Sequence, residues 1–225
     1  MADAESRTNR DTEDIRVLVT DDHPVVRDGL RAMLDEPGIN VVGEAATGQQ
    51  AVDRVGPLNA DVVLMDVRMP DMDGLTATKL VKQQHPGVAV IVITSFESED
   101  YLRQAVEAGA AGYLLKGMKR NLLVESIRVV RDGGSIFDPA MLASLLQDVA
   151  RREPGLEGTL DRLTERELRV LQLVAGGHTN REIADELGYS VGTIKNAVQR
   201  VIEKLDVSDR TQAAVLVVRA GIELD

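Results

Sequence analysis

Carboxylates, a lysine and a hydroxyl stand at the ends of short apolar runs in the first half of the chain. Asp21 and Asp22 follow the first run and Asp66 the third, while Thr94 ends the fourth and Lys116 follows the fifth. Clustered carboxylates repel one another unless a cation lies among them, and oxygen ligands of this kind suit Mg²⁺. A carboxylate nucleophile, a metal, a Lys and a hydroxyl are the parts of a phosphoryl-transfer site.

These residues converge only if the apolar runs are parallel strands of one sheet, whose carboxyl ends form a ligand-binding crevice. The expected strands are Ile15–Thr20, Ile39–Glu44, Asp61–Met65, Val88–Thr94 and Ala111–Leu115. Helical periodicity between and after them indicates Val25–Leu34, Gln49–Val55, Leu75–Gln84, Asp100–Ala108 and Leu122–Arg131. We therefore predict an α/β doubly wound, five-stranded parallel sheet. A single strand-end aspartate could equally cap a helix or close a turn, but so many suitable residues at strand ends make coincidence a poor explanation.

Composition narrows the possible functions. The 225 residues include no cysteine, three histidines and 2% aromatic residues, and their formal net charge is −11. These counts argue against disulfides, thiol catalysis, Cys- or His-based metal sites and aromatic base-stacking platforms. We see no secretory signal and no apolar run long enough to span a bilayer, so we expect a cytoplasmic protein without membrane contact. The acidity argues against nucleic-acid binding, unless a local basic face overrides the total charge.

The second half is expected to be entirely helical. Gly133, Gly134 and Pro139 end the first pattern, and the linker beyond them holds one short helix, Met141–Val149. Thr164 and Glu167 form a capping box for the first of four further helices. These are Glu165–Ala175, Asn180–Leu187, Val191–Leu205 and Arg210–Ala220, with Ser190 and Asp209 as caps of the last two.

The two middle helices of this half form a helix-turn-helix, which places its second helix in the DNA major groove. Lys195, Asn196 and Gln199 on that helix can read base edges, and Arg200 and Lys204 suit phosphates. A helical hairpin with polar residues outward is also a common structural element, so this geometry alone leaves DNA binding open.

Residues 15–133 resemble the receiver domain of bacterial two-component response regulators, which has a flavodoxin-like fold. The similarity lies in Thr-Asp-Asp-His-Pro at 20–24, Met-Asp-Val-Arg-Met-Pro at 65–70 and Gly-Tyr-Leu-Leu-Lys at 112–116. The resemblance implies that a histidine kinase phosphorylates Asp66 and that Thr94 and Lys116 contact the phosphoryl oxygens. It also implies that Asp21, Asp22, Asp66 and the backbone carbonyl of Arg68 bind Mg²⁺, and that Tyr113 is a switch residue.

Residues 160–220 are similar to the LuxR-type helix-turn-helix of the NarL/FixJ family. The matching motifs are Leu-Thr-Glu-Arg-Glu at 163–167, Thr-Asn-Arg-Glu-Ile-Ala at 179–184 and Ser-Val-Gly-Thr-Ile-Lys at 190–195. The resemblance implies base contacts from Lys195, Asn196 and Gln199, and backbone contacts from Thr179, Ser190, Thr193 and Arg210. One position departs from the family: Ala197 stands where a histidine is usual, which could remove a packing or phosphate contact.

We therefore expect a disordered tail (1–14), a receiver domain (15–133), a linker (134–159) and a small four-helix DNA-binding domain (160–225). The expected function is that of a phosphorylation-controlled transcriptional regulator that dimerises on activation, binds promoter DNA and is not an enzyme beyond its own phosphorylation. The alternative is a protein-interaction or phosphate-sink regulator that has lost DNA binding. An enzyme with a small-molecule substrate has the weakest support, because the second half adds no catalytic groups.

Overall fold

Runs of Val, Ile and Leu form a parallel sheet at the centre of the first domain. The computed structural model describes residues 14–137, 162–207 and 209–219. The strands are β1 (Ile15–Thr20), β2 (Ile39–Ala45), β3 (Val62–Asp66), β4 (Ala89–Thr94) and β5 (Gly112–Leu115). Their order is β2-β1-β3-β4-β5, with every neighbouring pair parallel. This order reverses direction at β1, which confirms the doubly wound sheet and puts a crevice at the carboxyl ends of β1 and β3.

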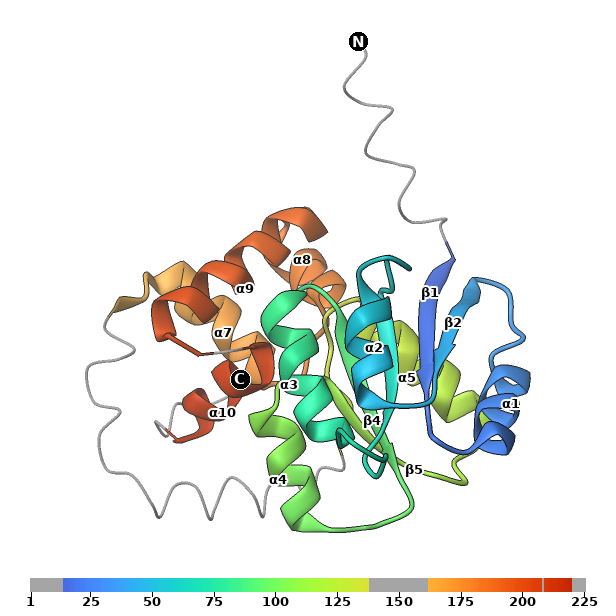
Figure 1. Cartoon of the computed structure of the whole chain (residues 1–225). Helices are drawn as coiled ribbons and strands as arrows, with labels where there is room; N and C mark the ends of the chain where they lie inside the picture. Colours follow the sequence, from blue (N-terminus) through green and yellow to red (C-terminus); the bar gives the residue numbers. More distant parts are fainter. Residues whose placement is uncertain (1–13, 138–161, 208, 220–225) are drawn as a thin grey trace.

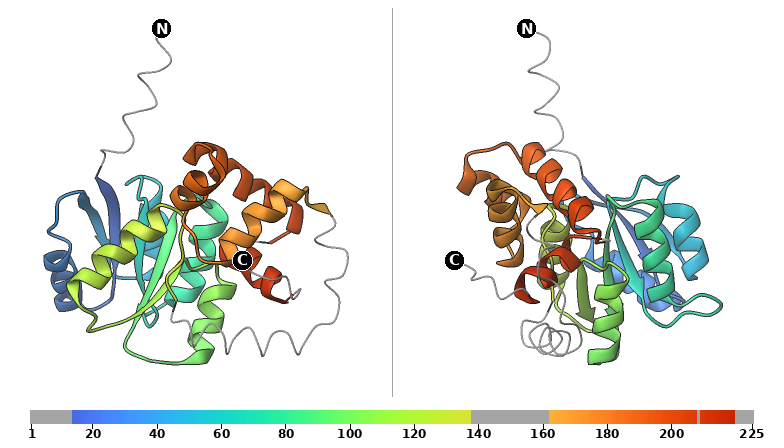
Figure 2. Two further views of the ribbon diagram at one scale, coloured as in Figure 1. Left: turned by 180° about the vertical axis from the view of Figure 1, so that it is seen from behind. Right: turned by 90° about the vertical axis from the view of Figure 1, so that its left-hand side faces the viewer.

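Helices cover both faces of the sheet (Figures 1 and 2). They are α1 (Pro24–Met33), α2 (Gly48–Val55), α3 (Gly74–Gln84), α4 (Glu99–Glu107) and α5 (Arg120–Arg131). Buried side chains of α1 and α5 pack on one face, and those of α2 and α3 on the other. The predicted bounds are correct to within two residues. The helices start earlier than the apolar periodicity indicates because capping residues such as Thr47 and Asp73 stand directly before them.

The second domain consists of helices α7 (Glu165–Ala175), α8 (Asn180–Leu187), α9 (Val191–Leu205) and α10 (Arg210–Arg219). The capping box of α7 is confirmed, since Thr164 Oγ1 accepts from the Glu167 amide and the Glu167 carboxylate accepts from the Thr164 amide. Ser190 caps α9 and Asp209 caps α10, as predicted. Gly188, with φ of 71°, ends α8 in the left-handed conformation and turns the chain into α9.

The helical domain lies against the receiver-like domain (Figure 1). The amide of Asn180 donates to the Asp132 carbonyl at 3.1 Å, and the Gln212 side chain donates to the Glu107 carbonyl at 3.2 Å. Val215 of α10 belongs to the same buried cluster as Leu102 of α4. The start of α8 and one side of α10 are thus docked on the first domain.

The segment after α5 extends the sheet. Ile136 forms a parallel bridge with Gly112, so that the Tyr113 amide donates to the Ile136 carbonyl and the Ile136 amide donates to the Ala111 carbonyl, both at 2.8 Å. The side chain of Phe137 packs against the α4 cluster. Residues 135–137 therefore cover the open edge of β5.

Some predictions fall outside the described residues, namely the tail before Asp14, the helix Met141–Val149 and the rest of the linker. The domain bounds as a whole stay a prediction. Within the described ranges, none of the helices combines the length and the apolar character needed to cross a bilayer.

Candidate functional site

The carboxyl ends of β1, β3 and β5 bring two aspartates and a lysine into direct contact. Lys116 Nζ lies 2.7 Å from Asp21 Oδ2 and 2.8 Å from Asp66 Oδ1. Asp21 is 1% exposed and Asp66 4%, so one cation bridges two buried carboxylates. Asp22 follows Asp21 and remains half-buried. The structure therefore places Asp21, Asp66 and Lys116 together as the sequence predicts.

Burial and neighbouring charges shift the pKa values of the groups in this site. Burial raises the pKa of the Asp66 carboxyl, and repulsion from Asp21 and Asp22 adds to this effect against the attraction of Lys116. Burial lowers the pKa of Lys116, but its hydrogen bonds to Asp21 and Asp66 outweigh that cost and raise it overall. Lys116 consequently stays protonated. It holds Asp66 close to the negative charges of Asp21 and Asp22, and a further cation would reduce the repulsion among these carboxylates.

The donor set fits Mg²⁺. Lys116 contacts Asp21 and Asp66, and Asp22 is a further negative charge near Asp66. An excess of carboxylate oxygens over cations is the ligand chemistry that Mg²⁺ prefers. Ligand atoms of Asp21, Asp22 and His23 all lie within 4.8 Å of one another, and His23 Nδ1 is 2.6 Å from Asp22 Oδ1. The predicted metal ligands do not include His23, although it directly follows the two aspartates in the sequence.

A rigid loop supports Asp66. The Gly74 amide donates to the Val67 carbonyl at 2.9 Å, and the Asp73 side chain accepts from the amides of Leu75 and Thr76 at the start of α3. A Cβ atom on Gly74 would lie 1.8 Å from the Asp66 carbonyl oxygen. Only glycine permits this close approach, which fixes the backbone of Asp66 against α3.

Thr94 and Tyr113 are connected through one residue of the loop that follows β4. The Phe96 amide donates to Thr94 Oγ1 at 3.2 Å, and Tyr113 Oη donates to the Phe96 carbonyl at 2.8 Å. Thr94 and Tyr113 are both buried, and burial raises the pKa of the Tyr113 hydroxyl. Thr94 and Tyr113 therefore both bind the backbone of Phe96.

Arg68 directs its side chain away from the carboxylates. Its guanidinium carbon lies 3.9 Å from the centre of the Phe96 ring, and its Nη2 atom donates to Tyr101 Oη at 3.0 Å. These contacts join the loop after β3 to α4 across the rim of the site. The predicted metal contact of the Arg68 backbone carbonyl stays a prediction.

The exposed face of α9 carries the three residues predicted to read bases, together with Arg200, which was predicted to contact phosphate. Lys195, Asn196, Gln199 and Arg200 are all exposed, whereas Ile194, Ala197 and Val198 are buried in the helical core. Ala197 is only 2% exposed. The departure from the usual histidine therefore changes core packing, because the Ala197 side chain does not reach the surface that would face DNA.

The residues predicted to meet the DNA backbone have different surroundings. Thr179 and Ser190 cap α8 and α9, and the Thr193 hydroxyl lies 2.8 Å from that of Ser190. Lys204 Nζ is paired with Glu167 at 2.6 Å. Arg210 donates to Asn180 Oδ1 and to the His178 carbonyl, and burial lowers its pKa to about 10. Arg210 thus fastens α10 to α8 in this conformation.

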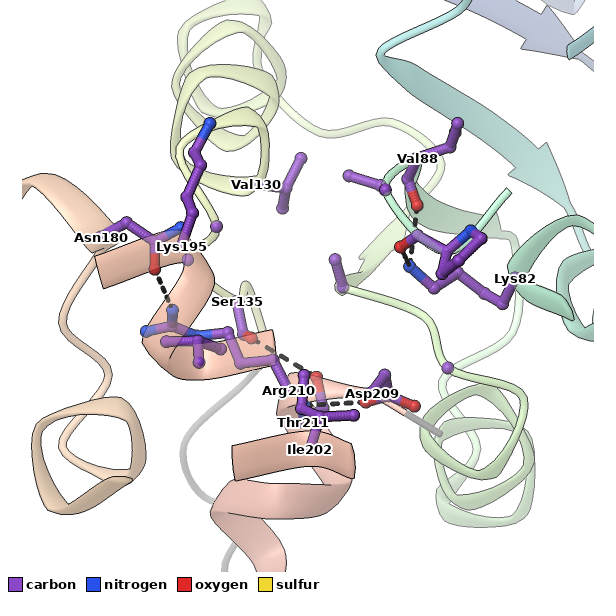
Figure 3. Close-up of a pocket in the computed structure, with 18 of the residues that line it drawn as sticks. Lys82, Val88, Val130, Ser135, Asn180, Lys195, Ile202, Asp209, Arg210 and Thr211 are labelled. Carbon is purple, nitrogen blue, oxygen red and sulfur yellow. Dashed lines mark hydrogen bonds between the residues drawn. The ribbon is translucent and has the colours of Figure 1, made fainter. Parts of the chain in front are cut away.

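Part of the α9 surface faces the other domain. A cavity of about 270 Å³ lies between the domains and is lined by Lys195 and Gln199 from α9 and by Val130 and Arg131 from α5, among others. Figure 3 shows Lys195, Asn180 and Arg210 on one side of this space and Val88 and Lys82 on the other. Two of the three candidate base-reading side chains therefore lie at the domain interface.

Two family models match the chain. The response regulator receiver domain matches residues 17–128, and the bacterial regulatory proteins of the luxR family match residues 161–217. The chain is 39% identical over 220 residues to the transcriptional regulatory protein LnrK of Bacillus subtilis, covering 93% of this chain and 99% of LnrK. It is 42% identical over 204 residues to LiaR of the same organism, covering 89% and 95%.

Solved structures of full-length regulators are similar as well. RcsB of Salmonella typhimurium is 29% identical with a TM-score of 0.53, covering 93% of this chain and all of RcsB. A complex of RcsB with DNA is 27% identical with a TM-score of 0.54, covering 94% of this chain and all of the RcsB chain. Both similarities extend over the two domains and not over the receiver alone.

Proposed function

Because this chain belongs to the response regulators that join a receiver to a LuxR-type DNA-binding domain, we propose that phosphorylation of Asp66 controls its binding to promoter DNA. The family membership makes it a two-component transcriptional regulator. The observation that carries the finer proposal is the contact of Lys116 with both Asp21 and Asp66, since it joins an acceptor carboxylate to a fixed cation in a buried crevice.

In the proposed reaction, an Oδ atom of Asp66 attacks the phosphorus of a phosphohistidine on a sensor kinase. The P–O bond forms while the P–N bond breaks, and its electron pair stays on the imidazole of the kinase. Lys116 and the Thr94 hydroxyl bind the transferred oxygens. Asp21, Asp22, Asp66 and the Arg68 carbonyl would hold Mg²⁺, which would neutralise charge on the transferred group when bound. The receiver is proposed to catalyse only its own phosphorylation and the hydrolysis of its own aspartyl phosphate, so we class the protein as a regulator and not as an enzyme.

The signal is proposed to leave the site through Thr94. A phosphoryl group on Asp66 adds about two negative charges and draws hydroxyl donors toward it. The Thr94 hydroxyl then gives up its contact with the Phe96 amide, and Tyr113 responds because it donates to the Phe96 carbonyl. Tyr113 also shares a backbone hydrogen bond with Ile136, beside the docked helical domain.

The output is proposed to be the release of α9. Lys195 and Gln199 face the interdomain cavity in this conformation, so that helix cannot present its whole polar face to a major groove. Phosphorylation shifts the population toward an undocked form, which dimerises through the helical domains and engages two half-sites about one DNA turn apart. We place this activity in the cytoplasm, where the kinase domain and promoter DNA are accessible.

The test compares Asp66→Asn with Asp71→Asn, which removes an exposed carboxylate from the same loop. DNA binding is measured by footprinting, with and without acetyl phosphate. We expect the donor to strengthen binding by the wild type and the Asp71 variant and to leave the Asp66 variant unchanged. Donor-dependent binding by Asp66→Asn refutes the mechanism. If none of the three proteins binds DNA, either with or without acetyl phosphate, the result favours a phosphate-sink regulator.

A further inference from the structure

A second cavity, of about 350 Å³, opens between the domains next to the first one. It is lined by Arg181 of α8 and by Val191 and Lys195 of α9, and on the receiver side by Arg16 and Arg131 among others. The two cavities share Val130, Arg131 and Lys195, so they form one interdomain cleft along the start of α9. Figure 3 shows Lys195 and Val130 at the wall of this cleft.

The cleft is basic in a protein that is strongly acidic overall. Four cationic residues line the 350 Å³ cavity against three carboxylates, Asp14, Asp61 and Asp132. Asp61 pairs with Arg16 at 3.2 Å, and Asp132 lies 3.7 Å from Arg131 and 3.9 Å from Arg181. Among the residues that the structure describes, Lys195 has no hydrogen-bond or ion-pair partner. The cleft therefore keeps positive charge for an anionic occupant.

The chain itself brings carboxylates to this place. Asp14, the residue directly before β1, lines the same cavity as Arg181 and Lys195. Residues 1–13 carry four acidic and two basic side chains, a net of −2; they are Asp3, Glu5, Arg7, Arg10, Asp11 and Glu13. The thirteen residues before Asp14 can reach up to about 40 Å, whereas α9 is only about 22 Å long. An acidic segment is thus tethered at the mouth of a basic cleft that it is long enough to fill.

We propose that the acidic N-terminal segment, residues 1–13, occupies the interdomain cleft beside Arg181 and competes with DNA for Lys195. This inference rests on the proposed function, because the competition matters only if α9 binds DNA. The tether supplies an effective concentration in the millimolar range, so even a weak contact is populated. The segment stabilises the docked form and mimics the phosphate backbone at the surface that reads DNA.

The first experiment neutralises the segment in the full-length, unphosphorylated protein. The test variant carries Asp3→Asn, Glu5→Gln, Asp11→Asn and Glu13→Gln. A matched control makes the same change in net charge with four exposed carboxylates on the receiver surface, Asp28→Asn, Asp35→Asn, Asp53→Asn and Glu125→Gln.

At about 0.1 M salt we expect the test variant to bind duplex DNA about five-fold more tightly than the wild type, and the control to change less than two-fold. The difference should vanish at about 0.5 M salt, because the competing interaction is electrostatic. Equal effects of the two variants overturn the proposal, since net charge alone then explains the gain.

The second experiment detects the docked segment without DNA. A carbodiimide joins a carboxylate to a lysine amine only when they touch. We expect it to link Lys195 to Asp3, Glu5, Asp11 or Glu13, as read by mass spectrometry of the intact chain's peptides. Links to Asp14 are not counted, because Asp14 already lines the cavity. Lys195→Arg keeps the charge and should abolish the link.

The two readouts separate the possible failures. No link to Lys195 from any of the four carboxylates overturns the docking. A link without any salt-sensitive DNA binding by any variant refutes the proposed function and the competition while leaving the docking intact. The third outcome is that added inorganic pyrophosphate abolishes the link while the test variant binds DNA with unchanged affinity. This result overturns the proposal in favour of a small anion as the occupant.

Discussion

Replacing Glu167 with Gln is expected to weaken the helical domain and to strengthen its binding to DNA at the same time. The Glu167 carboxylate accepts from the Thr164 amide and from Lys204 Nζ, at 2.9 Å and 2.6 Å. A Gln at this position preserves the capping box but removes the charge that holds Lys204. Lys204 then becomes available to a DNA phosphate, in keeping with the role that we propose for it.

The pKa of Glu167 sets the magnitude. The hydrogen bonds from Lys204 and the Thr164 amide lower it from 4.5 to about 2. A pKa change of one unit corresponds to about 1.4 kcal/mol, so the hydrogen bonds of the Glu167 carboxylate contribute at most roughly 3 kcal/mol to the free energy of unfolding. Because the Lys204 side chain is 38% exposed, water screens the pair, and we expect a loss of about 1–2 kcal/mol in Glu167→Gln. A carboxyl whose pKa is lower in the folded state stabilises that state at pH values above its unfolded pKa. The difference in the free energy of unfolding between wild type and Glu167→Gln should therefore hold above pH 4.5 and shrink as the pH falls toward 2.

Two assays test this reasoning. Urea denaturation at pH 7 gives the loss of stability, and repetition at lower pH tests the sign of the linkage. DNA titrations over a range of salt concentrations should show a steeper salt dependence, by about one phosphate contact, for Glu167→Gln. The matched variant Lys204→Met should lose stability as well but bind DNA less tightly. A Glu167→Gln protein that binds DNA no better than wild type refutes the idea that this ion pair restrains Lys204.

Two further predictions concern the receiver. Gly74→Ala should lower the free energy of unfolding by about 3 kcal/mol, because its Cβ would overlap the Asp66 carbonyl oxygen. Gly29→Ala in α1 should raise the free energy of unfolding by about 0.5–1 kcal/mol, because no atom lies within 4 Å of the added Cβ. Urea denaturation that gives the two changes the same sign contradicts this prediction. Tyr113→Phe removes the hydrogen bond to the Phe96 carbonyl and should reduce the donor-dependent gain in DNA affinity about five-fold at equal phosphorylation; a gain equal to that of the wild type argues against the proposed route.

The sheet and the contact at its carboxyl ends could be predicted because their signals are local. Continuous apolar runs ended by Asp21, Asp66 and Lys116 specify parallel strands and the edge at which those side chains meet. The burial of Ala197 was also readable, since it stands three residues after Ile194 and four before Val201 on the apolar stripe of α9. The resemblance to the family leaves packing and phosphate contact both open at this position, whereas the periodicity of α9 indicates packing.

The docking of the two domains could not be predicted in this way. It depends on pairs that are far apart in sequence, such as the Asn180 amide with the Asp132 carbonyl and the Thr211 hydroxyl with Ala110. Each side of such a pair is an ordinary polar group with no periodic pattern. Arg210 shows the same limit, because its type and place favour a phosphate contact while the fold directs it to Asn180 and the His178 carbonyl.

The bridge between Ile136 and Gly112 has a practical consequence for work with separate domains. A receiver fragment cut at residue 133 would expose the backbone groups of β5 that residues 135–137 now satisfy. An uncovered edge strand is a template for pairing with another chain, so such a fragment would self-associate for reasons unrelated to signalling. A fragment that ends after Phe137 keeps the edge of β5 covered. Of the two fragments, it is therefore the one whose oligomeric state can report on phosphorylation.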